Sequence, residues 1–432
     1  MTQVATPSPA QEKIRQDLRW NFVVNALDGA SFWFGVSFIS SAIILPLYVN
    51  HFTDNPLLIG LIPFLATVGM LFPQMFIANV VERAPKKKYF PATLGFFLER
   101  VPIFLLAPSA YFLATSRPML ALVAFFLLHA WHCFGVGLII VGWQDMIAKL
   151  IPVEKRGRFF GITNFMGNGA GILGALAVPF VLDQFAFPLG FVMAFAVASV
   201  LIFISWLFLS LTREPAVHSH KPRVSEVDYL RSLPEVLRSD RNFRMYLLAQ
   251  FIFSLSGMAT GFLVVYAVQT WALPDAEAGA FTIALQVGLA LANLFFGFFA
   301  DRKGHKLSLE ICIALNLLSL VLAIVAPSAL WFFAVFFLHG AVRAGLFVSG
   351  ISIVYEFTDE ENRPTYIGLA NTIPGVAGAV APIIGGWLAG AISYQAMFVV
   401  ALAIGIVSWG LLRFAVREPR GLAVPAEGLI IR

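Results

Sequence analysis

The chain contains little charge and almost no cysteine. Only 12% of its 432 residues are Asp, Glu, Lys or Arg, about half the share found in soluble domains. Its two cysteines, Cys133 and Cys312, lie far apart in predicted apolar helices and lack metal-ligand spacing, so neither a disulfide nor a metal centre is indicated. Residues 1–19 are polar and contain no apolar run typical of a cleaved signal peptide.

The motifs of several enzyme classes are also missing. The sequence has no G-x-x-x-x-G-K-[S/T] phosphate loop, which argues against ATP-driven transport by this chain. It has no H-E-x-x-H, no G-x-S-x-G and no cysteine pair at zinc spacing. We therefore predict that the protein is not an enzyme and that it holds no metal or organic cofactor.

Long apolar stretches make up most of the sequence. Hydrophobic residues account for 59% of the chain, and the mean hydropathy is +0.83. A helix that crosses a bilayer needs about 20 mostly apolar residues. Such stretches cover residues 20–49, 56–80, 89–114, 118–148, 158–182, 188–211, 244–271, 278–300, 307–327, 329–354, 364–390 and 393–416. The predicted fold class is an all-α integral membrane protein with about twelve transmembrane helices.

The basic residues alternate between loops. All but three of the 29 Lys and Arg residues lie in or beside the two termini and every second loop, the exceptions being Arg100, Arg117 and Arg343. Because basic loops stay in the cytoplasm, both termini are predicted to be cytoplasmic. The net charge of +5 reflects this bias, so we expect membrane lipids and a small-molecule substrate as partners, not nucleic acid. The expected location is the plasma membrane, or the inner membrane of a Gram-negative cell.

The predicted spans fall into two related halves. The expected segments are an N-terminal tail 1–19, a six-helix bundle 20–211, a basic central loop 212–243, a second six-helix bundle 244–416 and a C-terminal tail 417–432. Apolar residues between Val224 and Arg238 recur at the spacing of an amphipathic helix on the membrane surface. Similar residues recur at a constant offset in the two halves, for example Gly161 and Gly368. Such a duplication is typical of transporters.

A glycine-rich basic loop follows the eighth predicted span. Its key residues are Gly297, Asp301, Arg302, Gly304 and Lys306. The run is similar to the loop signature G-x-x-x-D-R-x-G-x-R/K of the major facilitator superfamily. This resemblance implies two pseudo-symmetric six-helix bundles that usually work as a monomer. It also implies a cytoplasmic gate, in which Asp301 pairs with a neighbouring helix end and Gly297 lets helices approach closely.

Further residues are expected at this gate. The first-half copy of the signature keeps only the acidic-basic pair Glu82 and Arg83. Two carboxylates at the ends of the fourth and tenth spans are each followed by a basic residue, and they resemble equivalent gate charges or ordinary helix-end carboxylates. These residues are Asp145 with Arg156 and Glu356 with Arg363.

The first predicted span carries a stripe of polar residues. Asn21, Asn25 and Asp28 fall at i, i+4 and i+7, so they share one helix face, which we expect to line a central cavity. A charge inside a bilayer costs about 2.5 kcal/mol or more, so such residues are functional candidates. A buried carboxyl group can take up and release a proton. Asp28 is therefore the first candidate for proton coupling, and a helix-packing contact is the alternative.

Three more intramembrane groups are candidates for the substrate cavity or the proton path. Adjacent side chains on a helix point about 100° apart, so Glu99 and Arg100 are expected to find partners on other helices rather than to pair with each other. The imidazoles of His129 and His132 could relay protons or could only pack, and two ligands are too few for a metal site. His339 and Arg343 lie one turn apart in the tenth span, where Arg343 is expected to be buried and could hold an anionic substrate or neutralise a carboxylate.

These features favour a secondary transporter that works by alternating access. The aromatic content and the few charges in the predicted cavity favour proton-coupled efflux of a lipophilic or amphipathic compound. Proton-coupled uptake of a sugar, carboxylate or peptide is the nearest alternative. A non-transporting membrane sensor or scaffold is a second one. A transporter of this kind needs no cofactor, and the expected coupling ion is H+.

Overall fold

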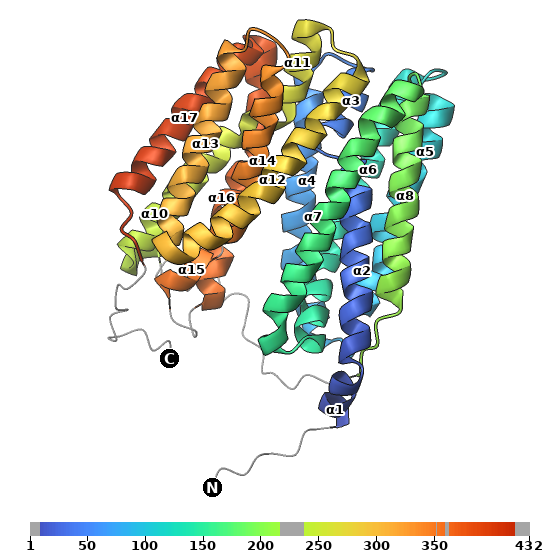
Figure 1. Ribbon diagram of the computed structural model, residues 1–432, viewed down its shortest axis with the longest axis vertical. Helices are drawn as coiled ribbons and strands as arrows, with labels where there is room; N and C mark the ends of the chain where they lie inside the picture. Colours follow the sequence, from blue (N-terminus) through green and yellow to red (C-terminus); the bar gives the residue numbers. More distant parts are fainter. Residues whose placement is uncertain (1–8, 217–236, 351, 359–362, 420–432) are drawn as a thin grey trace. The chain divides into compact units, whose positions relative to one another are not determined.

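The computed structural model describes residues 9–216, 237–350, 352–358 and 363–419 (Figure 1). Within these residues the regular structure is helical throughout. Eleven of the described helical segments are long and apolar enough to cross a membrane, which confirms the predicted all-α membrane fold but is one fewer than the twelve expected spans. The chain divides into two compact units, and each is described by itself.

The first unit contains Met1–Pro222 together with Val264–Ile283. Its helices are α1 (Pro9–Gln16), α2 (Leu18–Ser37), α3 (Ile44–Asn50), α4 (Pro56–Arg83), η1 (Tyr89–Leu94), η2 (Phe96–Arg100), α5 (Val101–Leu113), α6 (Pro118–Leu150), α7 (Val153–Gln184) and α8 (Leu189–Ser210). Here α2 packs against α7 and α8, and α4 packs against α6 (Figure 1). The aromatic core of the unit surrounds Tyr48, whose ring contacts Phe125, Phe191 and Phe195.

The second unit contains Arg223–Leu263 and Ala284–Arg432. The helical elements that follow α8 are α10 (Arg241–Ser256), η3 (Gly257–Phe262), α11 (Leu263–Trp271), α12 (Asp275–Lys303), α13 (His305–Val325), α14 (Trp331–Ser349), α15 (Ser352–Phe357), α16 (Arg363–Ala391) and α17 (Tyr394–Phe414). They belong to the second unit, except that Val264–Ile283, which covers most of α11 and the start of α12, belongs to the first. Phe243 packs against Phe357 and Tyr366 in the core of the second unit. Most of the amphipathic helix expected over 224–238 lies outside the described residues.

The first expected span, 20–49, is broken in the structure. The helix α2 ends at Ser37, and α3 begins only at Ile44. Because α2 carries Arg19, Asn21, Asn25 and Asp28, it is not among the eleven segments that are apolar enough to cross a membrane by composition alone. The first expected span therefore corresponds to this polar, interrupted helix.

Side-chain caps set the starts of several helices. The carboxamide oxygen of Asn55 accepts a hydrogen bond from the N–H of Leu57 (3.0 Å), and Pro56 occupies the first turn of α4. Asp240 accepts from the N–H of Phe243 (2.9 Å) at the start of α10. Each cap satisfies a backbone donor that has no partner within its own helix. The loop residues thus determine where these spans begin.

Glycines allow α4 and α6 to cross closely. A Cβ atom at Gly137 would overlap with the carbonyl oxygen of Gly69, and one at Gly69 would lie 2.7 Å from the Cβ of Cys133. The obstacle at Gly137 is backbone, which cannot turn away as a long side chain can. Small residues at such a crossing let two helix backbones come into direct contact.

We predict that Gly137→Ala destabilises the protein. Overpacking of this kind costs about 1–3 kcal/mol, so the melting temperature of the purified protein should fall. Gly169→Ala on α7 is the control, because a Cβ there meets no atom within 4 Å. Replacing a helical glycine by alanine in open space is favourable by about 1 kcal/mol. Equal melting temperatures for the two variants would contradict the prediction.

Candidate functional site

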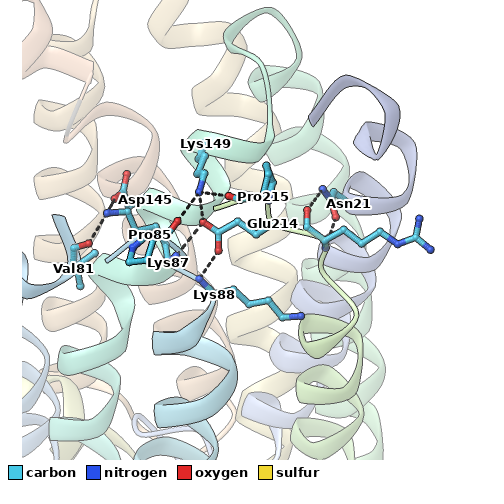
Figure 2. Close-up of polar contacts among 10 residues, drawn as sticks. Asn21, Val81, Pro85, Lys87, Lys88, Asp145, Lys149, Glu214 and Pro215 are labelled. Atoms are coloured by element: carbon cyan, nitrogen blue, oxygen red, sulfur yellow. Dashed lines mark hydrogen bonds and ion pairs between the residues drawn. The ribbon is translucent and has the colours of Figure 1, made fainter. Parts of the chain in front are cut away.

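A buried carboxylate joins three segments at one end of the first unit. Glu214 follows α8, and its side chain is 0% exposed. Its two oxygens accept hydrogen bonds from the N–H groups of Lys87 (2.9 Å) and Lys88 (2.7 Å). The ammonium of Lys149, at the end of α6, donates to the same carboxylate at 2.7 Å (Figure 2). These four residues are the Glu214 network.

The lysines of the network also bind the surrounding backbone. The Nζ of Lys149 donates to the carbonyls of Pro85 (3.2 Å) and Pro215 (2.7 Å). Lys88 Nζ donates to the carbonyls at the end of α8, at residues 210 (2.6 Å) and 212 (2.8 Å). The loop between α4 and η1 is therefore fastened to the ends of both α6 and α8.

An asparagine on α2 holds the segment that carries Glu214. The side-chain amide of Asn21 donates to the carbonyl of Arg213 (2.9 Å), and its oxygen accepts from the N–H of Arg213 (2.8 Å) (Figure 2). Asn25 donates to the hydroxyl of Thr212 at 3.1 Å. The Arg213 side chain pairs with Asp17 (2.9 Å) and lies over the ring of Trp20.

The second unit contains the same arrangement, in which an asparagine side chain binds both backbone groups of a distant arginine. We call each of the two arrangements an asparagine clamp. Asn242 donates to the carbonyl of Arg417 (3.1 Å) and accepts from its N–H (2.8 Å). Glu418, which follows, lies against Gly304: a Cβ there would be 2.8 Å from a Glu418 carboxylate oxygen. Gly304 also has φ = 93°, a conformation that favours glycine. The nearby Glu418 carboxylate and the positive φ together explain why the loop signature has a glycine at position 304.

Sequence reasoning missed both clamps. The signal that would have found them is a repeated tripeptide, Arg213-Glu214-Pro215 after the sixth span and Arg417-Glu418-Pro419 after the twelfth. Each half also begins with a helix that carries the matching asparagine, Asn21 or Asn242. The repeat is short, and its asparagine partner is distant in sequence.

Asp28 lies deep in α2 and faces α8. It is buried, and the hydroxyl of Ser205 donates to its carboxyl oxygen at 2.6 Å. Asn21 and Asn25 on the same helix face contact the segment after α8. The expected stripe is thus present, and its hydrogen bonds are with α8 and residues 212–213. The polar end of α8 offers the hydrogen-bond partners that the stripe requires.

Glu99 and Arg100 form an ion pair with each other, contrary to expectation. Both side chains are buried, and they lie at the end of η2, which is a π-helical turn. A π turn is wider than an α turn, so successive side chains diverge less, and such turns are frequent at functional sites. Gly95 makes room for the pair, since a Cβ there would lie 2.8 Å from a guanidinium nitrogen. The Arg100 Nε is buried and has no hydrogen-bond partner among the described residues.

The two histidines of α6 bind different neighbours. The Nε2 of His129 lies 3.1 Å from the carbonyl oxygen of Ile62 on α4, and its ring stacks on Phe125. The Nδ1 of His132 lies 2.9 Å from the carbonyl oxygen of Glu99 on η2. His132 therefore touches the backbone of the Glu99–Arg100 pair. The described part of the chain contains no group of three or more His, Cys, Asp or Glu side chains that could hold a metal ion.

The polar residues of α14 differ in exposure. His339 is buried, whereas Arg343, one turn later, is exposed. Sequence reasoning had expected Arg343 to be a basic charge buried within the membrane. An arginine is long enough to reach past its own helix and remain accessible. This exposed charge lies within the span Trp331–Phe357.

The gate residues are described only in part. The side chains of Glu82, Arg83, Arg156, Asp301 and Arg363 lie outside the described residues. Arg302 is exposed, and Glu356 on α15 is half-buried. Among the described residues, a Cβ at Gly297 would meet no atom within 4 Å.

Two described gate residues make ion pairs with residues that were not anticipated. Asp145 lies 3.3 Å from Lys87 Nζ, which also donates to the carbonyl of Val81 (Figure 2). Lys306 pairs with Glu310 on α13 at 3.1 Å. Arg413 on α17 shares Glu310 at 3.0 Å. The basic loops are thus linked to helix ends within each unit.

The fold is that of a multi-pass membrane protein built from two helical units. A family model described as Major Facilitator Superfamily matches residues 26–273 and, again, 246–429. The chain therefore belongs to the Major Facilitator Superfamily. It is a membrane transporter and not an enzyme.

Several known proteins are similar to it. An uncharacterised MFS-type transporter of Methanocaldococcus jannaschii, MJ1317, is 25% identical over 381 residues, which cover 86% of this chain and 89% of the relative. The multidrug resistance protein MdtL of Salmonella typhimurium is 29% identical over 150 residues, which cover 35% of this chain and 38% of MdtL. The structure of a D-xylose–proton symporter aligns with a TM-score of 0.70 at 15% identity, covering 94% of this chain and 99% of the symporter. For the nucleoside transporter NupG the TM-score is 0.65 at 14% identity, with 92% and 98% coverage.

We predict that Glu214→Gln destabilises the protein. The variant keeps the size of the side chain but removes a buried charge that Lys149 and two N–H groups contact, a loss of about 3 kcal/mol. Asp17→Asn is the control, because its partner Arg213 is 56% exposed and exposed pairs contribute at most about 1 kcal/mol. The measurement is thermal unfolding of both purified variants. A melting temperature for Glu214→Gln at or above that of Asp17→Asn would contradict the prediction.

Proposed function

We propose that this transporter exports a lipophilic or amphipathic compound in exchange for protons by alternating access. In this proposal the basic loops, the Glu214 network and both termini lie in the cytoplasm, as the distribution of Lys and Arg favours. The membrane is the plasma membrane, or the inner membrane of a Gram-negative cell. The protein works as a monomer without a cofactor.

The environment of Asp28 is the observation that supports proton coupling. Its carboxyl group is buried in the first unit and contacts the neutral hydroxyl of Ser205. A hydroxyl can donate to a carboxylate and can accept from a carboxylic acid, so Ser205 can serve both protonation states. Burying an ionised carboxyl group costs free energy. Entry of water beside Asp28 would therefore change the protonation of its carboxyl group.

The contacts of α2 suggest how protonation is linked to movement. Asp28 shares a helix face with Asn21 and Asn25, and these bind the segment at residues 212–213 that leads to Glu214. A change of charge on Asp28 would alter how firmly this face packs on α8. The two protonation states of Asp28 would then favour different positions of α2 against the clamp. Such a bistable contact is what alternating access requires.

The direction of transport rests on a partial resemblance. The multidrug resistance protein MdtL matches about a third of this chain, and the chain is rich in aromatic residues, with 43 Phe. Both features favour a lipophilic substrate that leaves the cell. The Glu99–Arg100 pair supports this, because these two intramembrane charges neutralise each other.

We expect Asp28→Asn to abolish proton-driven export. Cells that lack their own efflux pumps would express the native chain, Asp28→Asn or Asp183→Asn, and accumulation of lipophilic dyes would be measured. Asp183 is an exposed carboxylate at the end of α7, so its variant should behave like the native chain. The native chain should lower accumulation severalfold, and an uncoupler should remove this effect. Active export by Asp28→Asn at the native rate would refute its role in coupling.

An anionic substrate is the second candidate, and Arg343 favours it. A charged side chain that is exposed within a membrane-spanning helix is too costly to face lipid, so it is expected to face water. The planar guanidinium can bind a carboxylate through two parallel hydrogen bonds. Uptake of a carboxylate or an acidic peptide by proton symport would make use of this group.

We predict that Arg343→Gln separates these two functions. If the substrate is anionic, the variant should weaken binding of carboxylates to the purified protein by about tenfold or more, the value of a lost charged hydrogen bond. Binding of neutral dyes should not change. Arg117→Gln, in an exposed loop position, is the control. Unchanged carboxylate binding by Arg343→Gln would remove this candidate.

A further inference from the structure

A groove lies between the π-helical turns and α8 of the first unit. It has a volume of about 380 Å³. One end is polar and the remainder is mostly aromatic. The lining residues are Lys88, Ala92, Thr93, Phe96, Phe97, Trp206 and Ser210. None of the functions described above uses this groove.

The aromatic part of the groove is rigid. The indole N–H of Trp206 donates to the carbonyl of Ala92 at 2.7 Å, which fixes the ring. The same ring lies 4.7 Å from that of Phe96 and stacks on Phe203 at 5.5 Å. Phe97 is 58% exposed beside them. Because the indole donor is already satisfied, this surface offers an apolar ligand contact without leaving a polar group unpaired.

The polar end of the groove carries the ammonium of Lys88, whose donors are only partly used. Lys88 Nζ donates to the carbonyls of Ser210 and Thr212, and an ammonium has three donors. Burial holds the pKa of Lys88 below its ordinary value, although Glu214 acts in the opposite direction. The hydroxyl oxygen of Ser210 is buried without a hydrogen-bond partner among the described residues. An anion at this end would meet the remaining ammonium hydrogen of Lys88.

The groove lies where a bilayer changes from headgroups to hydrocarbon. Lys88 directly precedes the span Tyr89–Leu113, and Ser210 is the last residue of the span Leu189–Ser210. The cation is thus at the level of lipid phosphates, and the rings of Phe96, Phe97 and Trp206 lie within the spans. Basic pockets between helix ends suit anionic headgroups.

We propose that this groove binds one anionic phospholipid, with its phosphate on Lys88 and its upper acyl chain along Phe96, Phe97 and Trp206. The positive end and the apolar wall match the two parts of such a molecule in charge and polarity. Lys88 belongs to the Glu214 network through its backbone N–H. The bound lipid therefore also braces the loop that the network holds.

The test is binding of defined lipids to the full-length purified protein. Native mass spectrometry would count bound dioleoylphosphatidylglycerol and dioleoylphosphatidylcholine, and a thermal-shift titration would give the affinity for each. Variants are Lys88→Gln, which can still donate hydrogen bonds, and Phe97→Ala, whose exposed ring is not needed for folding. Lys86→Gln is the matched control, because Lys86 is an exposed lysine of the same loop that does not line the groove.

We expect one tightly bound phosphatidylglycerol on the native chain. A lysine at a membrane surface contributes about 1 kcal/mol to anionic-lipid binding, so Lys88→Gln should weaken the affinity about fivefold. Phe97→Ala should weaken it as well, and Lys86→Gln by less than twofold. If Lys88→Gln fails to fold, the comparison of the lipid affinities of Phe97→Ala and Lys86→Gln still tests the proposal.

Four results would overturn the proposal. Phosphatidylcholine could bind as tightly as phosphatidylglycerol, so that charge plays no part. Lys86→Gln could weaken binding as much as Lys88→Gln, which would indicate a diffuse surface charge. Phe97→Ala could leave the affinity unchanged, so that the groove is not occupied. Soluble glycerol phosphate could stabilise the protein as well as the lipid does, which would indicate a free-anion site.

Discussion

A carboxylate that is withdrawn from water must receive its hydrogen bonds from the protein. Glu214 meets this requirement with two backbone N–H groups and one ammonium. Its donors come from the loop between α4 and η1 and from the end of α6, so these segments can occupy only a narrow range of positions relative to α8. Asn21 then ties the same segment to α2. Several helix ends of the first unit are thus arranged around one buried charge.

The same rule operates within the spans, with other partners. Asp28 is met by a hydroxyl, and Glu99 is met by the arginine next to it in sequence. The second arrangement needs a π-helical turn and a glycine at position 95, so the local backbone is adapted to a charge pair. Polar groups in a bilayer have no water to bond, and the protein must provide each partner itself.

The sequence was most informative about length and polarity. Apolar stretches predicted the spans closely, because the bilayer sets a strict requirement for about 20 apolar residues. The pairing of Glu99 with Arg100 could not be predicted, since an ideal α-helix turns the two side chains apart. The clamp of Asn21 on Arg213 joins residues distant in sequence, with a backbone group as partner, and its signal in the sequence is only the short Arg-Glu-Pro repeat after each half. The sequence identified Asp28 as a buried carboxyl group, but its partner, Ser205 on α8, is set by tertiary packing. For Asp301 and Arg363 the predicted gate stays a prediction.

The asparagine clamps have a mechanical consequence. In each unit the first long helix holds the backbone just beyond the last one, through Asn21 with Arg213 and through Asn242 with Arg417. The first long helix of each bundle and the segment after its last helix are therefore held together by hydrogen bonds. Fraying of the backbone beyond the last helix of either bundle would therefore first have to break these two hydrogen bonds, which hold that segment to the first long helix.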